Sequence, residues 1–369
     1  MPSASFVIRY PAAAAATRVI VARGALSRLG AETRRVVSAT RVALVTDSHV
    51  GPLYARTAAR ALVRAGIAAQ LVTVPAGERS KSPERLAALW RSFAETGIGR
   101  ADAVVALGGG VVGDLAGFAA ASWLRGVPWI MVPTSLLAMV DSAAGGKTGI
   151  DLGEGKNLVG AFHQPRLVLA DPALLATLSA RHRRAGLAEV VKLGFAADPT
   201  LFRACERDAA RLAAGDLPAL ERVIVRSLRV KARVVSRDER EREGGGRTAL
   251  NFGHTLGHAY ETARGYRGVL HGEAVAVGMC VALRLSLIEA GLDPRVGARL
   301  EALIASLGLP RRLRGVRVGA LDAAMRHDKK RGSSEVRWVL TPRMGHASVP
   351  RSIITRLVHA ALLDVGARI

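Results

Sequence analysis

The chain has 369 residues, enough for two domains that each bury an apolar core without disulfide or metal staples. Its 53 Lys and Arg against 30 Asp and Glu give a formal charge of +23, which first suggests nucleic acid as a partner. The arginines are scattered along the whole length, often beside acids and without interleaved aromatic residues. We therefore expect no nucleic acid, but a solvated basic surface that also suits a small anionic substrate.

Cysteine content and hydropathy indicate the cellular compartment in which the protein is expected. Cys205 and Cys280 are the only cysteines and have no CxxC spacing, so two reduced core residues are expected. The stretch up to Gly24 lacks the charged segment and apolar block of a signal peptide, and no apolar run reaches about 18 residues. These features predict a cytoplasmic protein with no membrane span.

The first half alternates short β-branched segments with amphipathic ones. Helical spacing and a final glycine predict helices at 51–66 and 82–97. Strands are predicted between and beside them at 41–47, 68–77, 102–110, 128–135 and 166–172. Strands that alternate with helices form a mostly parallel sheet covered on both faces, so this half is expected to hold a nucleotide.

The second half is predicted to be helical. Segments 218–241, 271–291 and 295–310 have helical patterns punctuated by Gly or Pro. The sequence therefore predicts an α/β, Rossmann-like domain over residues 1–175 and an all-α domain over residues 176–369.

The stretch VVALGGGVVGDLAGF, residues 104–118, takes a buried strand into glycines and then into a helix expected to begin near Gly113 to Asp114. Glycine lets the backbone approach a pyrophosphate, whose charge the N–H groups of a helix N-terminus can meet. The pattern GGGxxGD departs from the dinucleotide fingerprint GxGxxG, and a simple packing turn is the alternative.

A second glycine-rich stretch, VDSAAGGKTGIDLGEGKNLVGAF at 140–162, contains Lys147, Lys156 and Asn157. Backbone amides and a mobile ammonium are suited to hold a phosphate. The spacing is not that of a Walker A sequence, which favours a phosphate-bearing small substrate over ATP. The alternative is an ordinary surface loop.

Three histidines follow in LNFGHTLGHAY and VLHGEAVAVGM. His254 and His258 share a helix face at i and i+4, His271 comes later, and Glu189 and Lys192 form a similar facing pair. Imidazole and carboxylate groups are the ligands of an open catalytic zinc site with three protein ligands. A glycine beside His254 and beside His271 is expected to keep bulk away from the ring. The residues predict that two of the three histidines and one carboxylate bind a divalent metal, and they leave open which two.

Several basic residues are ordinary solvated charges when taken singly. Lys329 and Lys330 in RHDKKRG are expected on a loop, and Lys231 and Arg247 stand elsewhere. With Lys147 they could surround an anion, but the sequence alone does not bring them together.

These motifs together resemble those of the 3-dehydroquinate synthases, within the sugar phosphate cyclase superfamily. The similarity extends from VTDSHVGPLY to RHDKKRG, and its motifs occur in family order: ALGGGVVGDLAGF, VPTSLLAMVDSAAGGKTG, GLAEVVK, LNFGHTLGHAYE and LHGEAVAVGM. The resemblance implies an N-terminal NAD-binding domain, a helical domain with one Zn²⁺ or Co²⁺ ion, an active site in the cleft between them and a homodimer.

The resemblance also implies roles for individual residues. The metal ligands match Glu189, His254 and His271, whereas His258 matches a contact to the substrate phosphate. The resemblance implies these other substrate contacts: Lys147, Asn157, Asn251 and Lys330 for the phosphate, Lys231 and Arg247 for the carboxylate, Asp141 and Lys192 for the ring hydroxyls, and Arg125 as a further active-site arginine. The NAD⁺ contacts are Asp47, Glu78, Lys81, Gly109, Gly110, Asp114, Thr134, Lys156 and Thr177.

The implied reaction converts 3-deoxy-D-arabino-heptulosonate 7-phosphate to 3-dehydroquinate and phosphate in the shikimate pathway. NAD⁺ takes up a hydride transiently, phosphate leaves by elimination, the hydride returns, and ring opening with an intramolecular aldol reaction closes the carbocycle. The chain departs from the family pattern in three places: TLSARHRRAG, GIDLGEGKN and a longer RDEREREGGGRTALN. The last leaves open whether Glu241 or Glu243 matches the family's active-site glutamate.

Three other functions compete with this one. A cyclase that makes an inosose or a valiolone from a neutral sugar phosphate has no substrate carboxylate to bind, so Arg247 favours dehydroquinate. A metal-dependent polyol dehydrogenase of the same fold would release NADH. A nucleic-acid-binding protein would show salt-sensitive retention on DNA and no turnover.

Overall fold

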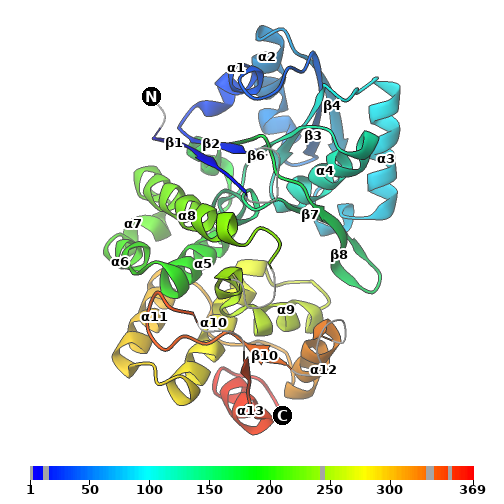
Figure 1. Cartoon of the computed structure of the whole chain (residues 1–369). Helices are drawn as coiled ribbons and strands as arrows, with labels where there is room; N and C mark the ends of the chain where they lie inside the picture. Colours follow the sequence, from blue (N-terminus) through cyan, green and yellow to red (C-terminus); the bar gives the residue numbers. More distant parts are fainter. Residues whose placement is uncertain (1–2, 11–15, 242–245, 330–335, 348–350) are drawn as a thin grey trace. The chain divides into compact units, whose positions relative to one another are not determined.

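The computed structural model describes residues 3–10, 16–241, 246–329, 336–347 and 351–369 (Figure 1). The chain forms two compact units. The first comprises Met1–Leu178 and Lys231–Arg240, and the second comprises Ser179–Val230 and Glu241–Ile369. The domain boundary at residues 175 and 176 stays a prediction.

A seven-stranded sheet with the order β1-β2-β9-β6-β5-β3-β4 forms the centre of the first unit. Only the β1–β2 pair is antiparallel, whereas the other neighbouring pairs are parallel. The central strands are β-branched and buried because helices cover both faces of a parallel sheet. The strands are β1 Ala4–Ile8, β2 Thr17–Val21, β3 Arg41–Asp47, β4 Ala68–Val74, β5 Ala103–Gly108, β6 Trp129–Pro133 and β9 Leu167–Ala170.

The five predicted strands are present, whereas β1 and β2 at the edge of the sheet were not predicted from the sequence. Four helices of this unit pack beside the sheet: α1 Leu29–Arg34, α2 Arg56–Arg64, α3 Pro83–Glu95 and α4 Gly110–Ser122 (Figure 1). Helix α3 begins at a proline after Ser82, whose hydroxyl accepts the Arg85 N–H. The alternation of strands and helices in the sequence therefore gives the predicted α/β architecture.

The second glycine-rich stretch forms a hairpin outside the main sheet. Strands β7, Lys147–Leu152, and β8, Gly155–Phe162, pair antiparallel. The strands approach closely because Gly149 and Gly160 oppose each other: a Cβ on Gly160 would lie 2.0 Å from the Thr148 carbonyl oxygen. This segment therefore forms a paired hairpin and not the ordinary surface loop that was the alternative reading of its sequence.

The second unit is largely helical, as predicted, and its described residues include one antiparallel pair of two-residue strands, β10 and β11. Helix α8 begins in this unit, and its residues from Lys231 onward group with the first unit. The elements are α5 Ala180–Ala197, α6 Pro199–Arg207, α7 Ala209–Ala214, α8 Leu217–Arg237, α9 His254–Ala263, α10 His271–Glu289, α11 Pro294–Ser306, α12 Val318–Lys329, β10 Arg337–Trp338, β11 Arg351–Ser352 and α13 Thr355–Asp364. Lys329 therefore ends a helix instead of lying on a loop, because the helical pattern continues through RHDK.

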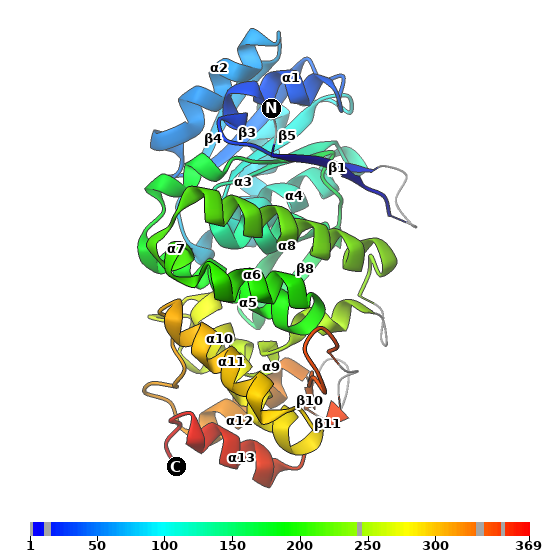
Figure 2. The ribbon, with the colours of Figure 1, turned by 90° about the vertical axis from the view of Figure 1, so that its left-hand side faces the viewer.

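Helix α10 is the core helix of this unit. It packs against α5, α9, α11 and α13 (Figures 1 and 2). It is long and apolar enough to cross a membrane by length and composition alone, but 72% of that stretch is buried inside the protein. Burial among neighbouring helices explains its apolar sequence without a lipid environment.

Asp198 joins two helices of the second unit. It caps α6 through the N–H groups of Thr200 and Leu201, and its two oxygens accept hydrogen bonds of 2.9 Å from the Arg226 guanidinium of α8. Burial alone would raise the pKa of Asp198, but Arg226 and the backbone amides outweigh it and hold this pKa below its usual value. The carboxylate therefore stabilises the fold when it is ionised.

We expect Asp198→Asn to destabilise the protein by about 2 kcal/mol at pH 7, since charge-assisted hydrogen bonds contribute roughly 1.5–3 kcal/mol. The folded-state pKa lies below the unfolded value of about 3.9, so this contribution is present above that value and is lost as the pH falls below it. Urea unfolding of both proteins between pH 7 and pH 3 measures the difference. A constant difference over that range would contradict the role of the charge.

Candidate active site

Glu189 lies on the buried face of α5 in the second unit. Its side chain is 0% exposed, and neither oxygen has a hydrogen-bond partner among the described residues. The ammonium of Lys192, one turn later and 2% exposed, forms an ion pair with Oε2. Burial of a carboxylate without hydrogen bonds lowers the stability of the fold, so this position is suited to an additional cation.

Two imidazoles face the other oxygen of Glu189. The distances from Glu189 Oε1 to His254 Nε2 and to His271 Nε2 are both 3.6 Å. Two ligands that bind one ion tetrahedrally at about 2.1 Å lie roughly 3.4 Å apart. The three side chains therefore fit a divalent ion with three protein ligands and an open fourth position.

The local electrostatics match this donor set. Burial and then the charge of Lys192 lower the pKa of His254 well below its usual value, so its ring is neutral. Burial would raise the pKa of Glu189, but Lys192 and the two histidines hold it well below its usual range. Burial would lower the pKa of His271, but its contacts with Glu189 and Glu261 outweigh burial and raise this pKa to about 10. The metal-free site therefore holds a carboxylate, a neutral imidazole and a proton that an ion would displace.

Helix α9 presents the remaining histidine beside this group. The His258 ring lies 5.3 Å from that of His254 and 5.9 Å from that of His271, and its side chain is exposed. His258 belongs to a second group of potential ligands, with Glu261 and His271, whereas Glu189 contacts His254 and His271.

The glycines beside the histidines have a different role from the one expected. Gly253 has a φ of 81° and precedes α9, and its carbonyl oxygen would lie 2.0 Å from a Cβ on Gly278 of α10. A Cβ on Gly272 would lie 1.8 Å from the Ala185 carbonyl oxygen of α5. These glycines let three backbones approach, and that approach holds the histidines near Glu189.

The glycine turn of the first unit follows strand β5. Helix α4 begins at Gly110, earlier than the predicted Gly113 to Asp114, because Gly109 already has an extended backbone that ends the strand. The first N–H groups of α4 are therefore those of the glycine motif itself. Asp47 ends strand β3, and its carboxylate accepts the N–H groups of His49 and Val50 at 2.8 Å.

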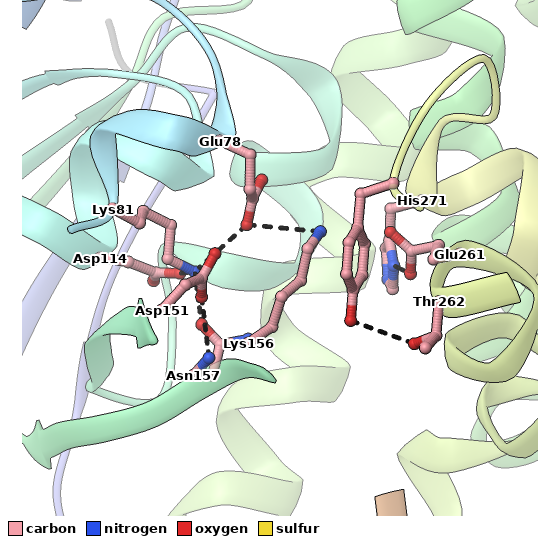
Figure 3. A network of polar contacts seen from close by, with 10 residues as sticks. Glu78, Lys81, Asp114, Asp151, Lys156, Asn157, Glu261, Thr262 and His271 are labelled. Atoms are coloured by element: carbon pink, nitrogen blue, oxygen red, sulfur yellow. Dashed lines mark hydrogen bonds and ion pairs between the residues drawn. The ribbon is translucent and has the colours of Figure 1, made fainter. Parts of the chain in front are cut away.

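Lys81 is the centre of an ionic cluster in the same unit (Figure 3). Its side chain is 3% exposed, and Nζ lies 2.9 Å from Asp114 Oδ2, 3.5 Å from Glu78 Oε1 and 3.7 Å from Asp151 Oδ1. Burial would lower the pKa of Lys81, but these carboxylates raise it. The ammonium therefore stays charged and joins the start of α4 to the β7–β8 hairpin.

The hairpin carries two of the predicted residues into this cluster. Asn157 has a φ of 54°, and its N–H donates to Asp151 Oδ1 at 2.8 Å while its side-chain oxygen accepts from Lys81. The Lys156 ammonium lies 3.4 Å from Glu78. The predicted residues Glu78, Lys81, Asp114, Lys156 and Asn157 are thus brought together.

Other predicted residues of the first unit lie at strand ends or short turns. Asp141, in the turn Ala138–Ser142, forms an ion pair with the buried Lys231. The Thr177 hydroxyl lies 2.7 Å from the Tyr54 hydroxyl. Thr134 is buried after β6, Lys147 is exposed at the start of β7, and Arg125 is exposed with a φ of 67°.

The last predicted residues belong to the second unit. The Asn251 amide donates to Glu241 Oε1 at 2.9 Å, and Arg247 is buried in the neighbouring turn Gly246–Asn251. Glu243 and Lys330 lie outside the described residues.

Two acidic residues near the predicted ones were not expected from the sequence. Asp151 fixes the backbone of Asn157, and Glu261 Oε2 lies 2.9 Å from His271 Nδ1 (Figure 3). Glu261 follows His254 and His258 at i+7 and i+3, so helical spacing places all three on one face of α9. Helical spacing could therefore have indicated Glu261, whereas the role of Asp151 is recognisable only once the pairing of β7 with β8 is known.

Comparison with known proteins gives consistent matches over most of the chain. The family description 3-dehydroquinate synthase N-terminal matches residues 71–185, and 3-dehydroquinate synthase C-terminal matches residues 186–331. The 3-dehydroquinate synthase of Symbiobacterium thermophilum is 49% identical over 345 residues, which cover 92% of this chain and 93% of that protein.

Two solved structures show the same architecture. One is 2-deoxy-scyllo-inosose synthase complexed with carbaglucose-6-phosphate, NAD⁺ and Co²⁺, with a TM-score of 0.90, 25% identity and coverage of 98% of this chain and 100% of that one. The other is 2-epi-5-epi-valiolone synthase from Streptomyces hygroscopicus subsp. jinggangensis 5008 with NAD⁺ and Zn²⁺ bound, with a TM-score of 0.86, 29% identity and coverage of 99% of both chains. The two family matches and the 49% identity show that the chain belongs to the 3-dehydroquinate synthase family.

Proposed function

We propose that the protein is a lyase that converts 3-deoxy-D-arabino-heptulosonate 7-phosphate to 3-dehydroquinate and phosphate in the shikimate pathway. The observation that carries the proposal is the buried group of Glu189, His254 and His271, with the spacing of three ligands around one divalent ion. The 49% identity to a 3-dehydroquinate synthase supports the choice of reaction.

The proposal uses NAD⁺ and Zn²⁺ or Co²⁺. When bound, the ion makes a coordinated hydroxyl more acidic, and NAD⁺ accepts a hydride and returns it. Glu189, His254 and His271 hold the ion. Lys192, buried beside Glu189, keeps that carboxylate ionised and presents an ammonium to a ring hydroxyl, for which Asp141 is the other proposed contact.

The NAD⁺ contacts come from the first unit. The start of α4 at Gly110 offers backbone N–H groups to the pyrophosphate, and the charged Lys81 keeps Asp114 and Glu78 in fixed positions. The full proposed set is Asp47, Glu78, Lys81, Gly109, Gly110, Asp114, Thr134, Lys156 and Thr177.

The substrate is a sugar acid with a phosphate, so it needs two anion contacts. Lysine and arginine supply charge, while asparagine and neutral histidine supply hydrogen bonds. We assign the phosphate to Lys147, Asn157, Asn251, His258 and Lys330, and the carboxylate to Lys231 and Arg247. Arg125 is a further active-site arginine. Glu241, which accepts the Asn251 amide hydrogen bond, is the proposed match to the family's active-site glutamate.

Sequence identity favours this reaction over those of the other cyclases. The inosose and valiolone synthases are only 25% and 29% identical to the chain. Arg247 is also 3% exposed, and a buried arginine is suited to a substrate carboxylate that neutral sugar phosphates lack. We further propose a homodimer and a cytoplasmic location.

Turnover of the full-length protein tests the function. With catalytic NAD⁺ and added Zn²⁺ or Co²⁺, we expect one phosphate for each 3-dehydroquinate formed from the heptulosonate phosphate, and no net NADH because the hydride returns. Phosphate release, product mass and absorbance of NADH measure these quantities.

Glucose and sedoheptulose phosphates serve as competing substrates in the same assay. Preferred turnover of either would assign the protein to another cyclase reaction. Accumulation of NADH with a simple polyol would instead indicate a dehydrogenase.

A further inference from the structure

The carboxylate of Glu261 lies against the ring nitrogen of His271 that faces away from Glu189. Glu261 Oε2 is 2.9 Å from His271 Nδ1, whereas His271 Nε2 is 3.6 Å from Glu189 Oε1 (Figure 3). An imidazole that uses Nε2 as a ligand has its proton on Nδ1, and a carboxylate is a strong acceptor for that proton.

Glu261 is buried on the helix that also carries His254. Its side chain is 8% exposed, and the i, i+4, i+7 spacing places His254, His258 and Glu261 on one face of α9. The helix therefore supplies one proposed ligand directly and reaches a second one, His271, through Glu261.

The ring of His271 needs this support because its backbone is held separately. His271 is the first residue of α10, and the Glu273 carboxylate accepts the Leu270 N–H at 2.9 Å. Arg181 of α5 binds Glu273 through two hydrogen bonds of 2.6 and 2.7 Å. These contacts fix where the helix starts, whereas rotation of the imidazole is limited by Glu261.

Glu261 does not have the geometry of a ligand in its own right. Together with His258 and His271 it could form another group of three potential ligands. However, two ligands of one ion lie roughly 3.4 Å apart, and the 2.9 Å between Glu261 and Nδ1 is a hydrogen-bond distance. The arrangement favours a hydrogen bond from Nδ1 to Glu261 and a metal bond from Nε2.

We propose that Glu261 is a positioning residue of the metal centre: it accepts the Nδ1–H of His271 and so holds the ring with an unprotonated Nε2 directed at the ion. The inference rests on the proposed function for the identity of the metal site. Loss of such a partner typically weakens metal binding about 10–100-fold.

The test measures Zn²⁺ affinity by chelator competition on the full-length protein without substrate or NAD⁺. Glu261→Ala removes the acceptor, and Glu261→Gln keeps the shape and one neutral oxygen acceptor. The matched control is Asp322→Asn, which removes the charge from another carboxylate–imidazole pair of the same unit, in which Asp322 Oδ2 lies 2.5 Å from His359 Nε2. Thermal unfolding of the metal-free proteins checks that each variant folds.

We expect Glu261→Ala to bind Zn²⁺ about 10–100-fold more weakly, Glu261→Gln to lie between it and the wild type, and Asp322→Asn to match the wild type. Co²⁺ absorption should show an altered ligand field in Glu261→Ala only. If Glu261→Ala does not fold, a loss of affinity in the isosteric Gln variant still supports the proposal.

Wild-type affinity in folded Glu261 variants would overturn the proposal. So would complete loss of metal in Glu261→Gln combined with retention in Glu189→Gln, because Glu261 would then be a ligand. Failure of the proposed function gives a different result: Zn²⁺ binding that depends on Glu261, with no turnover of the heptulosonate phosphate.

Discussion

Replacement of His254 by Ala is expected to weaken metal binding about a hundredfold or more, whereas replacement of His258 leaves the metal in place. His254 Nε2 lies 3.6 Å from Glu189 Oε1 and is in the group of three proposed ligands. If about 10 kcal/mol of binding free energy is shared by three ligands, the loss of one costs roughly 3 kcal/mol. His258 is exposed, and its proposed role is to contact the substrate phosphate.

Chelator competition and metal content after dialysis measure the first effect, and KM for the heptulosonate phosphate measures the second. His258→Ala should retain the ion and show a raised KM. His359→Ala, which changes an imidazole paired with Asp322 in the same unit, is the control and should match the wild type in both measurements. Equal loss of metal from His254→Ala and His258→Ala would contradict the division of roles.

Gly278→Ala is expected to destabilise the protein by about 3 kcal/mol and to weaken metal binding as well. The added Cβ would lie 2.0 Å from the Gly253 carbonyl oxygen and 3.1 Å from the Gly257 backbone nitrogen. Backbone atoms cannot rotate away as a long side chain can, so α10 and the turn before His254 must separate. Overpacking of a core typically lowers the free energy of unfolding by about 1–3 kcal/mol, and we expect a clash with backbone atoms to give a value near the upper limit.

Urea unfolding followed by circular dichroism, on metal-free and Zn²⁺-loaded protein, measures both effects. The matched control is Gly319→Ala in α12, where a Cβ meets nothing within 4 Å. That change should be neutral or stabilise by up to about 1 kcal/mol, because alanine has the higher helix propensity. Similar stability of the two variants would show that the α9–α10 approach tolerates a methyl group.

The local patterns of the sequence were sufficient for the sheet and the main helices. β-branched runs ended by turn residues predicted β3 to β6 and β9, and apolar residues at helical spacing predicted α3, α10 and α11. Strands β1 and β2 were not predicted because an antiparallel edge pair has no helix between its strands. The β7–β8 hairpin was not predicted either. Its glycines allow two backbones to approach closely, and the sequence does not distinguish such glycines from those of a turn.

The site was predictable in residue types but not in contacts. Helical spacing showed that His254 and His258 share a face, but the distance to Glu189 depends on how α5, α9 and α10 pack, which no local pattern contains. The choice of His271 over His258 came from family resemblance, and it stays a prediction that the geometry supports. Glu261 and Asp151 act through other residues, so neither is recognisable until the residues they hold are known.

The three proposed ligands are far apart in the chain: Glu189 and His271 are separated by 271 − 189 = 82 positions. An ion held by both closes this long loop in the folded protein and has no comparable site in the unfolded chain. Such a ligand adds about 2.7 kcal/mol to folding stability at a free concentration one hundred times its dissociation constant. The supply of zinc or cobalt in the cell would then govern the lifetime of the polypeptide against proteolysis as well as its rate of turnover.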